Sequence, residues 1–458
     1  MKIKDLIPSE EYNQTIAYED IDIDFCTNDF KKVKNKTLLF LLPGVNFDTY
    51  KLIPEFLKSK PQLIVTENKA LFHKTKIPLI EVKNARRCFA YAMSSICQID
   101  YKKLTFIGVT GTNGKTSVAT IIKNILESNG RKCGFIGTGK IEFQNKLLTD
   151  ENYSMTCPDP DVLYPAIKKM QSLGCEIIVM EASSHALQLE KLSAIKFKIG
   201  IFTSLSHEHL EFHKTMENYF KAKEKLINNC EKAIINCDDE YGKRLYKKYK
   251  NKSHSIGILE RNDSYASDVK TYGFSGSEFL YIRKEIKSKI QLFIPGVYNV
   301  YNSMLAIEAG YQMNISLKKI KNSLKNLKAI DGRFECINGD RMVIIDYAHT
   351  PAALENLLKT IKCDKKTEQK ICLIFGCGGD RDREKRPMMA ECAEKYADRI
   401  IVTNDNPRNE NETDIIKQIM SGFKNTKYSI IQNREQAIKY AIKSSDKNEI
   451  IVIACSLF

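Results

Sequence analysis

Residues 110–116, Thr-Gly-Thr-Asn-Gly-Lys-Thr, have the composition of a loop that binds phosphate groups. Glycines let backbone N–H groups approach phosphate oxygens, and the amino terminus of a following helix adds positive potential. Lys115 would reach the terminal phosphates of a nucleotide, and Thr116 would ligate Mg²⁺. The general motif has a glycine five residues before Gly114, where this chain has Val109, so the match is to a shortened loop.

Histidines and acidic residues form a second group with chemical potential. Five of the seven histidines lie near candidate motifs: His185, His207, His209, His213 and His349. Imidazoles spaced two and four apart in residues 207–213 could converge on zinc in a hydrolase. Glu181 and residues 207–213 each follow an apolar run, however, and ligands bind at the carboxyl ends of parallel strands. One carboxylate, one imidazole and phosphate oxygens suit Mg²⁺ better than zinc, and the zinc hydrolase stays a distant alternative.

The elements that would position these residues alternate between strand and helix. Residues 105–109 form an apolar run typical of a buried strand. A stripe with helical period follows the loop, at Val118, Ile121, Ile122, Ile125 and Leu126. Residues 177–180 and 199–202 fit further strands that are buried on both faces. This pattern predicts an α/β domain around the phosphate loop.

The carboxy-terminal part predicts a second, doubly wound α/β domain. Its expected strands are residues 342–345, 371–375, 400–403 and 450–454, and a helical stripe runs through Leu354, Leu357, Leu358 and Ile361. A helical pattern over residues 300–329 precedes it, and the first 100 residues suggest a small separate α/β domain. We therefore expect three domains, residues 1–101, 102–334 and 335–458.

Composition limits the class of protein. A chain of 458 residues is long enough for about three domains, and 43% hydrophobic with 28% charged residues is ordinary for a globular protein. The apolar run 38–42 is far shorter than the ~18 residues of a membrane helix, and no signal peptide is recognisable, so we expect a cytoplasmic protein. The fourteen scattered cysteines are expected to be free thiols. The net charge of +15 suits phosphate-bearing small molecules, because the lysines form no nucleic-acid-binding run.

Five segments, taken together and in this order, resemble the Mur ligases over nearly the whole chain. They are residues 110–116, 181–185 (Glu-Ala-Ser-Ser-His), 346–351 (Asp-Tyr-Ala-His-Thr-Pro), 376–381 (Gly-Cys-Gly-Gly-Asp-Arg) and 405–408 (Asp-Asn-Pro-Arg). The resemblance is strongest to the members that add the third peptide residue in peptidoglycan assembly. It implies a UDP-substrate domain, a central ATPase domain and a Rossmann-like amino-acid domain, and a monomer without nucleic-acid or membrane partners.

The resemblance also implies a mechanism and its residues. ATP would phosphorylate the carboxylate of UDP-MurNAc-L-Ala-D-Glu, and the incoming amine would displace the phosphate. Lys115 and Lys223 would be catalytic, with Lys223 carbamylated, and Mg²⁺ would be held by Thr116, Glu181, His209 and the Lys223 carbamate. The nucleotide would contact Gly111, Thr112, Asn113, Gly114, Lys115, Thr116, Asn299, Asn302, Arg333 and Asp346, with His349 near the same cleft.

Two further sets of residues are implied for the other substrates. Thr156, Ser183 and Lys191 would bind the UDP-substrate; Lys191 stands where the family usually has arginine. No uridine-binding residue is recognisable around residues 28–30. Arg381, Asp405, Asn406 and Arg408 would bind the amino acid. Because Arg408 can pair bidentately with a second carboxylate, we expect meso-diaminopimelate rather than L-lysine, which remains the nearest alternative.

The chain departs from the family at its last residues. Residues 450–454 match a family strand that is normally followed by Gly-Lys-Gly-His-Glu and a few dozen residues, but here Cys455, Ser456, Leu457 and Phe458 follow. We therefore expect an incomplete third domain, with an uncovered sheet edge or face and weak or absent ligation.

Overall fold

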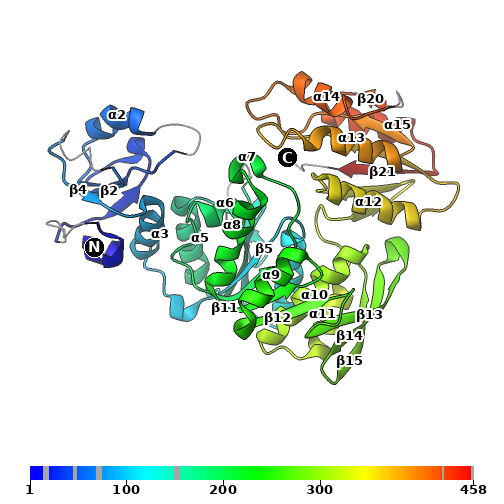
Figure 1. Cartoon of the computed structure of the whole chain (residues 1–458), viewed down its shortest axis with the longest axis horizontal. Coiled ribbons are helices and arrows are strands. Elements are labelled where there is room, and N and C mark those ends of the chain that lie inside the picture. The colour runs from blue at the N-terminus through cyan, green and yellow to red at the C-terminus, as the bar shows by residue number, and fades with distance from the viewer. Residues whose placement is uncertain (14–19, 45–48, 69–74, 149–154, 425–427, 455–458) are drawn as a thin grey trace. The chain divides into compact units, whose positions relative to one another are not determined.

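The computed structural model describes residues 1–13, 20–44, 49–68, 75–148, 155–424 and 428–454 (Figure 1). It divides into two compact units. The first unit holds residues 1–108, 131–198 and 228–231, and the second holds residues 109–130, 199–227 and 232–458. The described residues form three sheets with flanking helices, which confirms the α/β class. No helix among them is long and apolar enough to cross a bilayer.

The first sheet is small and wholly parallel. Its strands, in spatial order, are β1 (Phe25–Thr27), β2 (Thr37–Phe40), β3 (Leu63–Thr66) and β4 (Leu79–Glu81). The accompanying helices are α1 (Ile3–Leu6), α2 (Ile53–Lys58) and α3 (Ala85–Ile96). Asn84 caps α3 by accepting a hydrogen bond from the Arg87 backbone N–H at 2.9 Å. Leu39, Ile64 and Phe56 form a buried core between this sheet and α2.

The second sheet contains the strand that leads into the phosphate loop. Its order is β15-β14-β13-β12-β11-β10-β5-β9-β6-β7-β8. The strands are β5 (Thr105–Thr110), β6 (Cys133–Gly137), β7 (Lys140–Phe143), β8 (Lys146–Leu147), β9 (Ile177–Glu181), β10 (Phe197–Phe202), β11 (Cys230–Asn236), β12 (Ser253–Gly257), β13 (Ser264–Thr271), β14 (Ser277–Arg283) and β15 (Ile286–Leu292). The β6–β9, β11–β12 and β12–β13 pairs are parallel, whereas β13, β14 and β15 form an antiparallel meander. The three strands expected here are confirmed as β5, β9 and β10.

Three helices of this region, α4, α6 and α9, begin within a few residues of the carboxyl end of a strand. The helices of this region are α4 (Lys115–Glu127), α5 (Pro160–Ser172), α6 (Ser184–Gln188), α7 (Leu210–His213), α8 (Met216–Asn228), α9 (Glu240–Lys248), α10 (Val297–Gln312) and α11 (Leu317–Asn326). All five residues of the stripe expected on α4 are buried. Asn124 on α4 donates to the Ser323 carbonyl of α11 at 3.0 Å, which links the two helices.

The third sheet is doubly wound, as expected. Its order is β16 (Glu335–Asn338), β17 (Met342–Asp346), β21 (Glu449–Ala454), β18 (Lys370–Phe375), β19 (Arg399–Val402) and β20 (Tyr428–Ile430), and its helices are α12 (Pro351–Asp364), α13 (Lys385–Tyr396), α14 (Glu412–Met420) and α15 (Arg434–Ser444). Alternate side chains of β18 face opposite cores: Leu373 joins α12, α13 and α14, and Ile374 joins α15. Helices therefore cover both faces.

Residues 450–454, after which we expect an uncovered sheet edge or face, themselves form a central strand. This strand is β21, and it pairs in parallel with β17 on one side and β18 on the other. The described sheet has its edges at β16 and β20. A strand that is late in the sequence can be central in a doubly wound sheet, because strand order in space does not follow chain order. Residues 455–458 lie outside the described residues.

A buried carboxylate holds the antiparallel meander against α10. Glu308 is fully buried and accepts hydrogen bonds from Ser264 Oγ at 2.7 Å, Tyr281 Oη at 2.5 Å and Arg283 Nε at 3.2 Å. The Nε2 atom of His254 lies 3.1 Å from its second oxygen. Burial raises the pKa of Glu308, but His254 and these hydrogen bonds outweigh burial and lower it below its ordinary value.

Replacing Glu308 by Gln should destabilise this region by about 2 kcal/mol at pH 7, because Arg283 and His254, both partly buried, would lose their hydrogen bonds to a buried carboxylate. A carboxylate with a lowered pKa contributes stability above its unfolded pKa and loses it as pH falls through the folded pKa. The difference between variant and wild type should therefore shrink below about pH 4. Urea unfolding at several pH values measures it. Glu278→Gln on β14, which removes an ion pair with the exposed Lys289, is the control and should change stability much less. If the difference in the free energy of unfolding between Glu308→Gln and wild type stayed constant across this pH range, the lowered pKa of Glu308 would be contradicted.

Candidate functional site

The loop between β5 and α4 requires glycine at two positions. Gly111 has φ +151°, and a Cβ added there would lie 1.8 Å from Thr203 Oγ1. Gly114 has φ +84°, and its added Cβ would lie 2.6 Å from Asn302 Oδ1. A side chain at either position would collide with these neighbours, so the backbone approaches them closely because both residues lack a Cβ.

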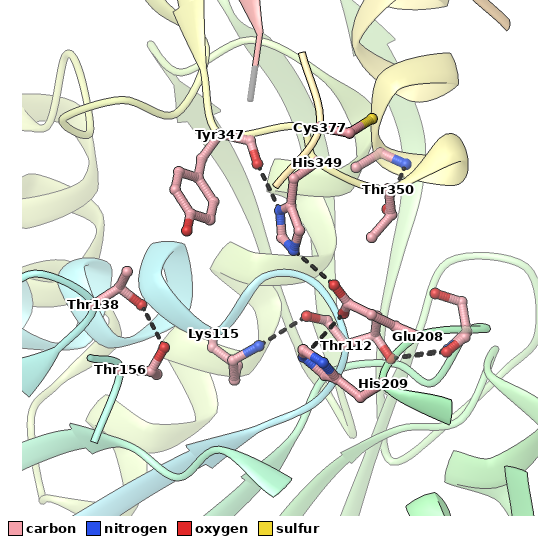
Figure 2. A network of polar contacts seen from close by, with 12 residues as sticks. Thr112, Lys115, Thr138, Thr156, Glu208, His209, Tyr347, His349, Thr350 and Cys377 are labelled. Atoms are coloured by element: carbon pink, nitrogen blue, oxygen red, sulfur yellow. Dashed lines mark hydrogen bonds and ion pairs between the residues drawn. The ribbon is translucent and has the colours of Figure 1, made fainter. Parts of the chain in front are cut away.

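The loop is held by hydrogen bonds to the segment that follows β10. The Thr112 N–H donates to the Ser204 carbonyl at 2.7 Å, and Thr203 Oγ1 donates to the Asn113 carbonyl at 2.5 Å. Lys115 Nζ donates to the Thr112 carbonyl at 2.8 Å (Figure 2). The sequence analysis did not identify Thr203 or Ser204; their position directly after an expected central strand was the available signal.

Lys223 is the second lysine at this loop. It lies on α8, is only 1% exposed, and donates from Nζ to the Gly111 carbonyl at 2.6 Å. Lys115 donates to the same carbonyl at 3.1 Å. Burial, and then the charge of Lys115, lower the pKa of Lys223 well below its ordinary value. The Tyr219 ring lies 4.5 Å from Lys223 Nζ. A solvated helix lysine, which helical pattern alone would suggest, is excluded.

Two asparagines from α10 reach the other side of the loop. Asn299 and Asn302 are both buried, and Asn302 Nδ2 donates to Asn299 Oδ1 at 2.9 Å. Asn299 Nδ2 in turn donates to the Pro295 carbonyl at 2.6 Å. The structure thus connects the expected pair to each other and places Asn302 beside Gly114.

Arg333 and Asp346 lie next to the start of α4. Arg333 Nη2 donates to Thr116 Oγ1 at 2.9 Å, and its guanidinium lies over the Tyr347 ring at 4.5 Å. Asp346 accepts a hydrogen bond from the Phe334 N–H at 2.8 Å. Burial raises the pKa of Asp346, and the charge of Arg333 opposes that rise. Residues far apart in the sequence therefore meet at Thr116.

The histidine-rich segment does not form a metal cluster. His209 has φ +57° and lies beside Glu208 and Glu211, with N···O distances of 3.8 and 3.5 Å. His207 Nδ1 instead lies 3.3 Å from Asp382 Oδ2. Burial lowers the pKa of His213 to about 4. Among the described residues, no three or more His, Cys, Asp or Glu side chains form a group that could hold a metal ion.

Glu208 makes a contact that the sequence did not suggest. It is 3% exposed, and its Oε1 lies 2.7 Å from His349 Nε2, whose ring also contacts the Tyr347 carbonyl through Nδ1 at 2.9 Å (Figure 2). Burial raises the pKa of Glu208, but His209 and His349 lower it well below its ordinary value. The contact between Glu208 and His349 links the segment after β10 to the segment after β17.

The first unit holds the remaining expected ligands of the metal and the UDP-substrate. Glu181 ends β9, is fully buried, and accepts from the Thr138 N–H at 2.9 Å and Thr138 Oγ1 at 3.3 Å. Thr138 Oγ1 also lies 3.1 Å from Thr156 Oγ1 (Figure 2). The hydroxyl of Ser183 caps α6, and Lys191 Nζ lies 2.6 Å from Asp159 Oδ1. The other expected metal-binding residues, Thr116, His209 and Lys223, belong to the second unit.

The four expected amino-acid-binding residues lie in loops after β18 and β19. Arg408 Nη1 donates to the Gly379 carbonyl at 2.7 Å, and Asn406 accepts the Gly379 N–H through its carbonyl at 2.9 Å. Burial, and then the charge of Arg381, lower the pKa of Arg408. Arg381 has no hydrogen-bond or ion-pair partner among the described residues. Asp405 lies 3.8 Å from Arg434. Two neighbouring guanidiniums favour an anionic ligand.

A glycine-dependent phosphate loop on a mixed sheet, followed by a doubly wound domain, defines a nucleotide-binding α/β protein. Family models agree: the Mur ligase middle domain matches residues 109–310, and the Mur ligase glutamate ligase domain matches residues 332–457. Two relatives, from Clostridium acetobutylicum and Clostridium tetani, are 36% and 38% identical over 99% of this chain and 94% of theirs. Both are UDP-N-acetylmuramoyl-L-alanyl-D-glutamate--2,6-diaminopimelate ligases. The chain belongs to the Mur ligase family.

Solved structures support this assignment. A structure of UDP-N-acetylmuramoyl-L-alanyl-D-glutamate--2,6-diaminopimelate ligase aligns with a TM-score of 0.70 and 26% identity, covering 99% of this chain and 93% of its own. Mycobacterium tuberculosis folylpolyglutamate synthase shares the fold, with a TM-score of 0.66 and 16% identity over 81% of this chain and 92% of its own. The ligases of this family use ATP, which agrees with the loop at residues 110–116.

Replacing Lys115 by Ala should weaken ATP binding about 100-fold, because charged hydrogen bonds to the phosphates would be lost. The fold should persist, since this lysine contacts backbone carbonyls of its own loop. Titration with a fluorescent ATP analogue measures affinity, and circular dichroism reports folding. Lys221→Ala, an exposed position on α8, is the control. Wild-type affinity in a folded Lys115→Ala protein would refute the phosphate-loop assignment.

Proposed function

We propose that this protein is the ATP-dependent ligase that adds meso-diaminopimelate to UDP-N-acetylmuramoyl-L-alanyl-D-glutamate in peptidoglycan biosynthesis. The observation that carries the proposal is the pair of lysine side chains, Lys115 and Lys223, that share the Gly111 carbonyl at the phosphate loop. Lys115 supplies positive charge where ATP and a carboxylate, both anions, must meet, and a carbamate on Lys223 would help to hold the Mg²⁺ that adds to it. The names of the full-length relatives support the identity of the substrates.

The reaction transfers the γ-phosphoryl group to the terminal carboxylate of the dipeptide and releases ADP. Phosphorylation supplies the leaving group that an unactivated carboxylate lacks. The amine of diaminopimelate attacks the acyl carbon, the tetrahedral intermediate loses inorganic phosphate, and the amide forms. Lys115 serves the phosphates, and Asn299 and Asn302 lie on the adenine side. Arg333, at the hinge between domains, and Asp346, in the third domain, hold the nucleotide.

Mg²⁺ would be held by Thr116, Glu181, His209 and Lys223. When bound, it would neutralise phosphate charge during phosphoryl transfer. The hydroxyl and the buried carboxylate are oxygen donors of the kind that Mg²⁺ prefers. A protonated Lys223 would repel a cation, so the donor set fits Mg²⁺ when this lysine is carbamylated. Its lowered pKa favours the neutral amine that carbamylation requires.

Thr156, Ser183 and Lys191 are proposed to face the UDP-substrate. Lys191 lies beside Asp159 and offers one ammonium, without the bidentate fork of an arginine. We retain the division into domains 1–101, 102–334 and 335–458 as part of the proposal. We place the reaction in the cytoplasm, as a step of cell wall biogenesis, and propose a monomer that needs no nucleic acid.

The second carboxylate of diaminopimelate is proposed to bind between Arg381 and Arg408. Each guanidinium raises the electrostatic cost of the other, and an anion between them relieves that cost. Asp405 and Asn406 then face the ammonium at the same end of the substrate. L-lysine has no carboxylate there and would leave both guanidiniums unpaired.

Phosphate release with ATP, UDP-MurNAc-dipeptide and either amino acid tests the proposed function. We expect turnover with meso-diaminopimelate and at least 100-fold lower kcat/KM with L-lysine. Arg408→Ala should raise the KM for diaminopimelate about 100-fold, because a bidentate charged pair is lost. Lys417→Ala, an exposed position on α14, is the control. Comparable use of L-lysine, or an unchanged KM in Arg408→Ala, would contradict the assignment.

Replacing Lys223 by Ala should lower activity strongly, and short carboxylic acids should partly restore it by standing in for the carbamate. Lys221→Ala, two residues away on the exposed side of α8, should be active and insensitive to these acids. Intact-protein mass under carbon dioxide gives an independent readout. An unmodified wild-type mass together with failed rescue would count against the carbamate.

A further inference from the structure

Two loops of the third sheet are joined to each other along their length. They are the β18 loop, residues 376–384, and the β19 loop, residues 403–411. Asp380 Oδ2 accepts from the backbone N–H of Asn409 at 3.1 Å and from its Nδ2 at 2.8 Å. An added Cβ at Gly379 would lie 1.9 Å from the Pro407 carbonyl oxygen, so the two backbones are in direct contact. Displacing one loop therefore displaces the other.

The loops hold strained backbone beside their binding residues. Asp380 has φ +51° and Arg408 has φ +49°, in a region that residues with a Cβ seldom adopt. Such conformations persist when surrounding contacts determine them. Arg381 directly follows Asp380, so both guanidiniums that are proposed to bind the amino acid depend on this backbone.

A buried ion pair behind the loops supplies such contacts. Arg386, in the first turn of α13, is fully buried, and Nη1 and Nη2 donate to the two carboxylate oxygens of Glu410 at 3.0 and 2.9 Å. The same guanidinium donates to the Gly378 carbonyl at 3.1 Å and to Gln418 Oε1 on α14 at 2.6 Å. Glu410 also accepts the Asp380 N–H at 2.6 Å. The Arg386 side chain thus connects the β18 and β19 loops to helices α13 and α14.

The chemistry of the pair suits positioning. A guanidinium presents a rigid, planar fork that matches a carboxylate, so it fixes orientation as well as distance. Arg386 lowers the pKa of Glu410, which keeps the carboxylate ionised at neutral pH. A buried charge is costly and gives little net stability against an apolar replacement, so stability alone does not explain it.

We propose that Arg386 and Glu410 are positioning residues for the amino-acid substrate: they hold the β18 and β19 loops so that Arg381 and Arg408 face the same carboxylate. Neither side chain needs to touch the substrate. The inference rests on the proposed function for the identity of that substrate, whereas the coupling of the two loops rests on the contacts alone.

A second ion pair in the same domain provides a matched control. Arg399 Nε and Nη2 donate to Glu449 Oε1 and Oε2 at 3.0 and 2.6 Å, and Glu449 is 7% exposed. These residues begin β19 and β21, whereas the β18 and β19 loops follow the carboxyl ends of their strands. The control pair therefore has the same chemistry at the opposite ends of the strands.

The experiment compares Glu410→Gln and Arg386→Lys with Glu449→Gln and Arg399→Lys in the full chain. Thermal midpoints and the KM for diaminopimelate, ATP and UDP-MurNAc-dipeptide are measured for each. We expect the Glu410 and Arg386 variants to raise the KM for diaminopimelate at least 10-fold and to leave the other two within twofold. The control pair should lower the thermal midpoint without this selective change. A uniform rise in all three KM values, an unchanged KM for diaminopimelate, or an equal effect of the control pair would overturn the proposal.

Hydrogen exchange separates this inference from the proposed function. In Glu410→Gln, amides of residues 378–382 and 405–410 should exchange at least 10-fold faster, while those of residues 110–116 keep their wild-type rates. Unchanged exchange in the two loops would overturn the positioning role, whatever the substrate. A wild-type protein that releases no phosphate with diaminopimelate would instead refute the proposed function and leave the exchange result to decide the inference.

Discussion

Two lysine side chains that share one carbonyl oxygen are the constraint on which this site depends. Lys115 and Lys223 both donate to Gly111, and the charge of each opposes that of the other. Like charges this close are stable only where anions or proton loss compensate them. Three features keep the Lys115 and Lys223 side chains beside the Gly111 carbonyl. They are the absence of a Cβ at Gly111, the close approach of Gly111 to Thr203 and the burial of Lys223. A triphosphate and a carboxylate are the anions that a ligase of this family brings together.

The carboxy-terminal region also holds two basic side chains close together, here the guanidiniums of two arginines. Arg381 and Arg408 are held near each other by loops whose strained backbone would relax without support. The ion pair of Arg386 and Glu410 is placed to provide that support. In both places the protein pays an electrostatic cost in the absence of substrate, and an anionic group offsets that cost on binding. The same pair of basic side chains then sets both the affinity for the anionic group and its orientation.

Local pattern was sufficient for much of the fold and part of the site. The strands β5, β9 and β18 and the buried stripe of α4 follow from apolar runs and helical period, and glycine spacing located the phosphate loop. Lys223 came from family resemblance, since its helical position alone suggested solvent. The contacts of Glu208 with His349 and of Arg386 with Glu410 join residues far apart in the chain, which no local pattern encodes. The central place of residues 450–454 in the third sheet could not be predicted, because chain order does not give the spatial order of strands.

The central claim is that the phosphate loop, with Lys115 and Lys223, brings ATP and a carboxylate together so that an acyl phosphate forms. Transfer of oxygen from the carboxylate to the released phosphate tests this most directly. UDP-MurNAc-dipeptide labelled with ¹⁸O in its terminal carboxylate would be incubated with ATP and diaminopimelate, and the phosphate would be analysed by mass spectrometry. The account predicts one labelled oxygen in the phosphate for each amide bond formed. Amide formation with unlabelled phosphate would contradict it.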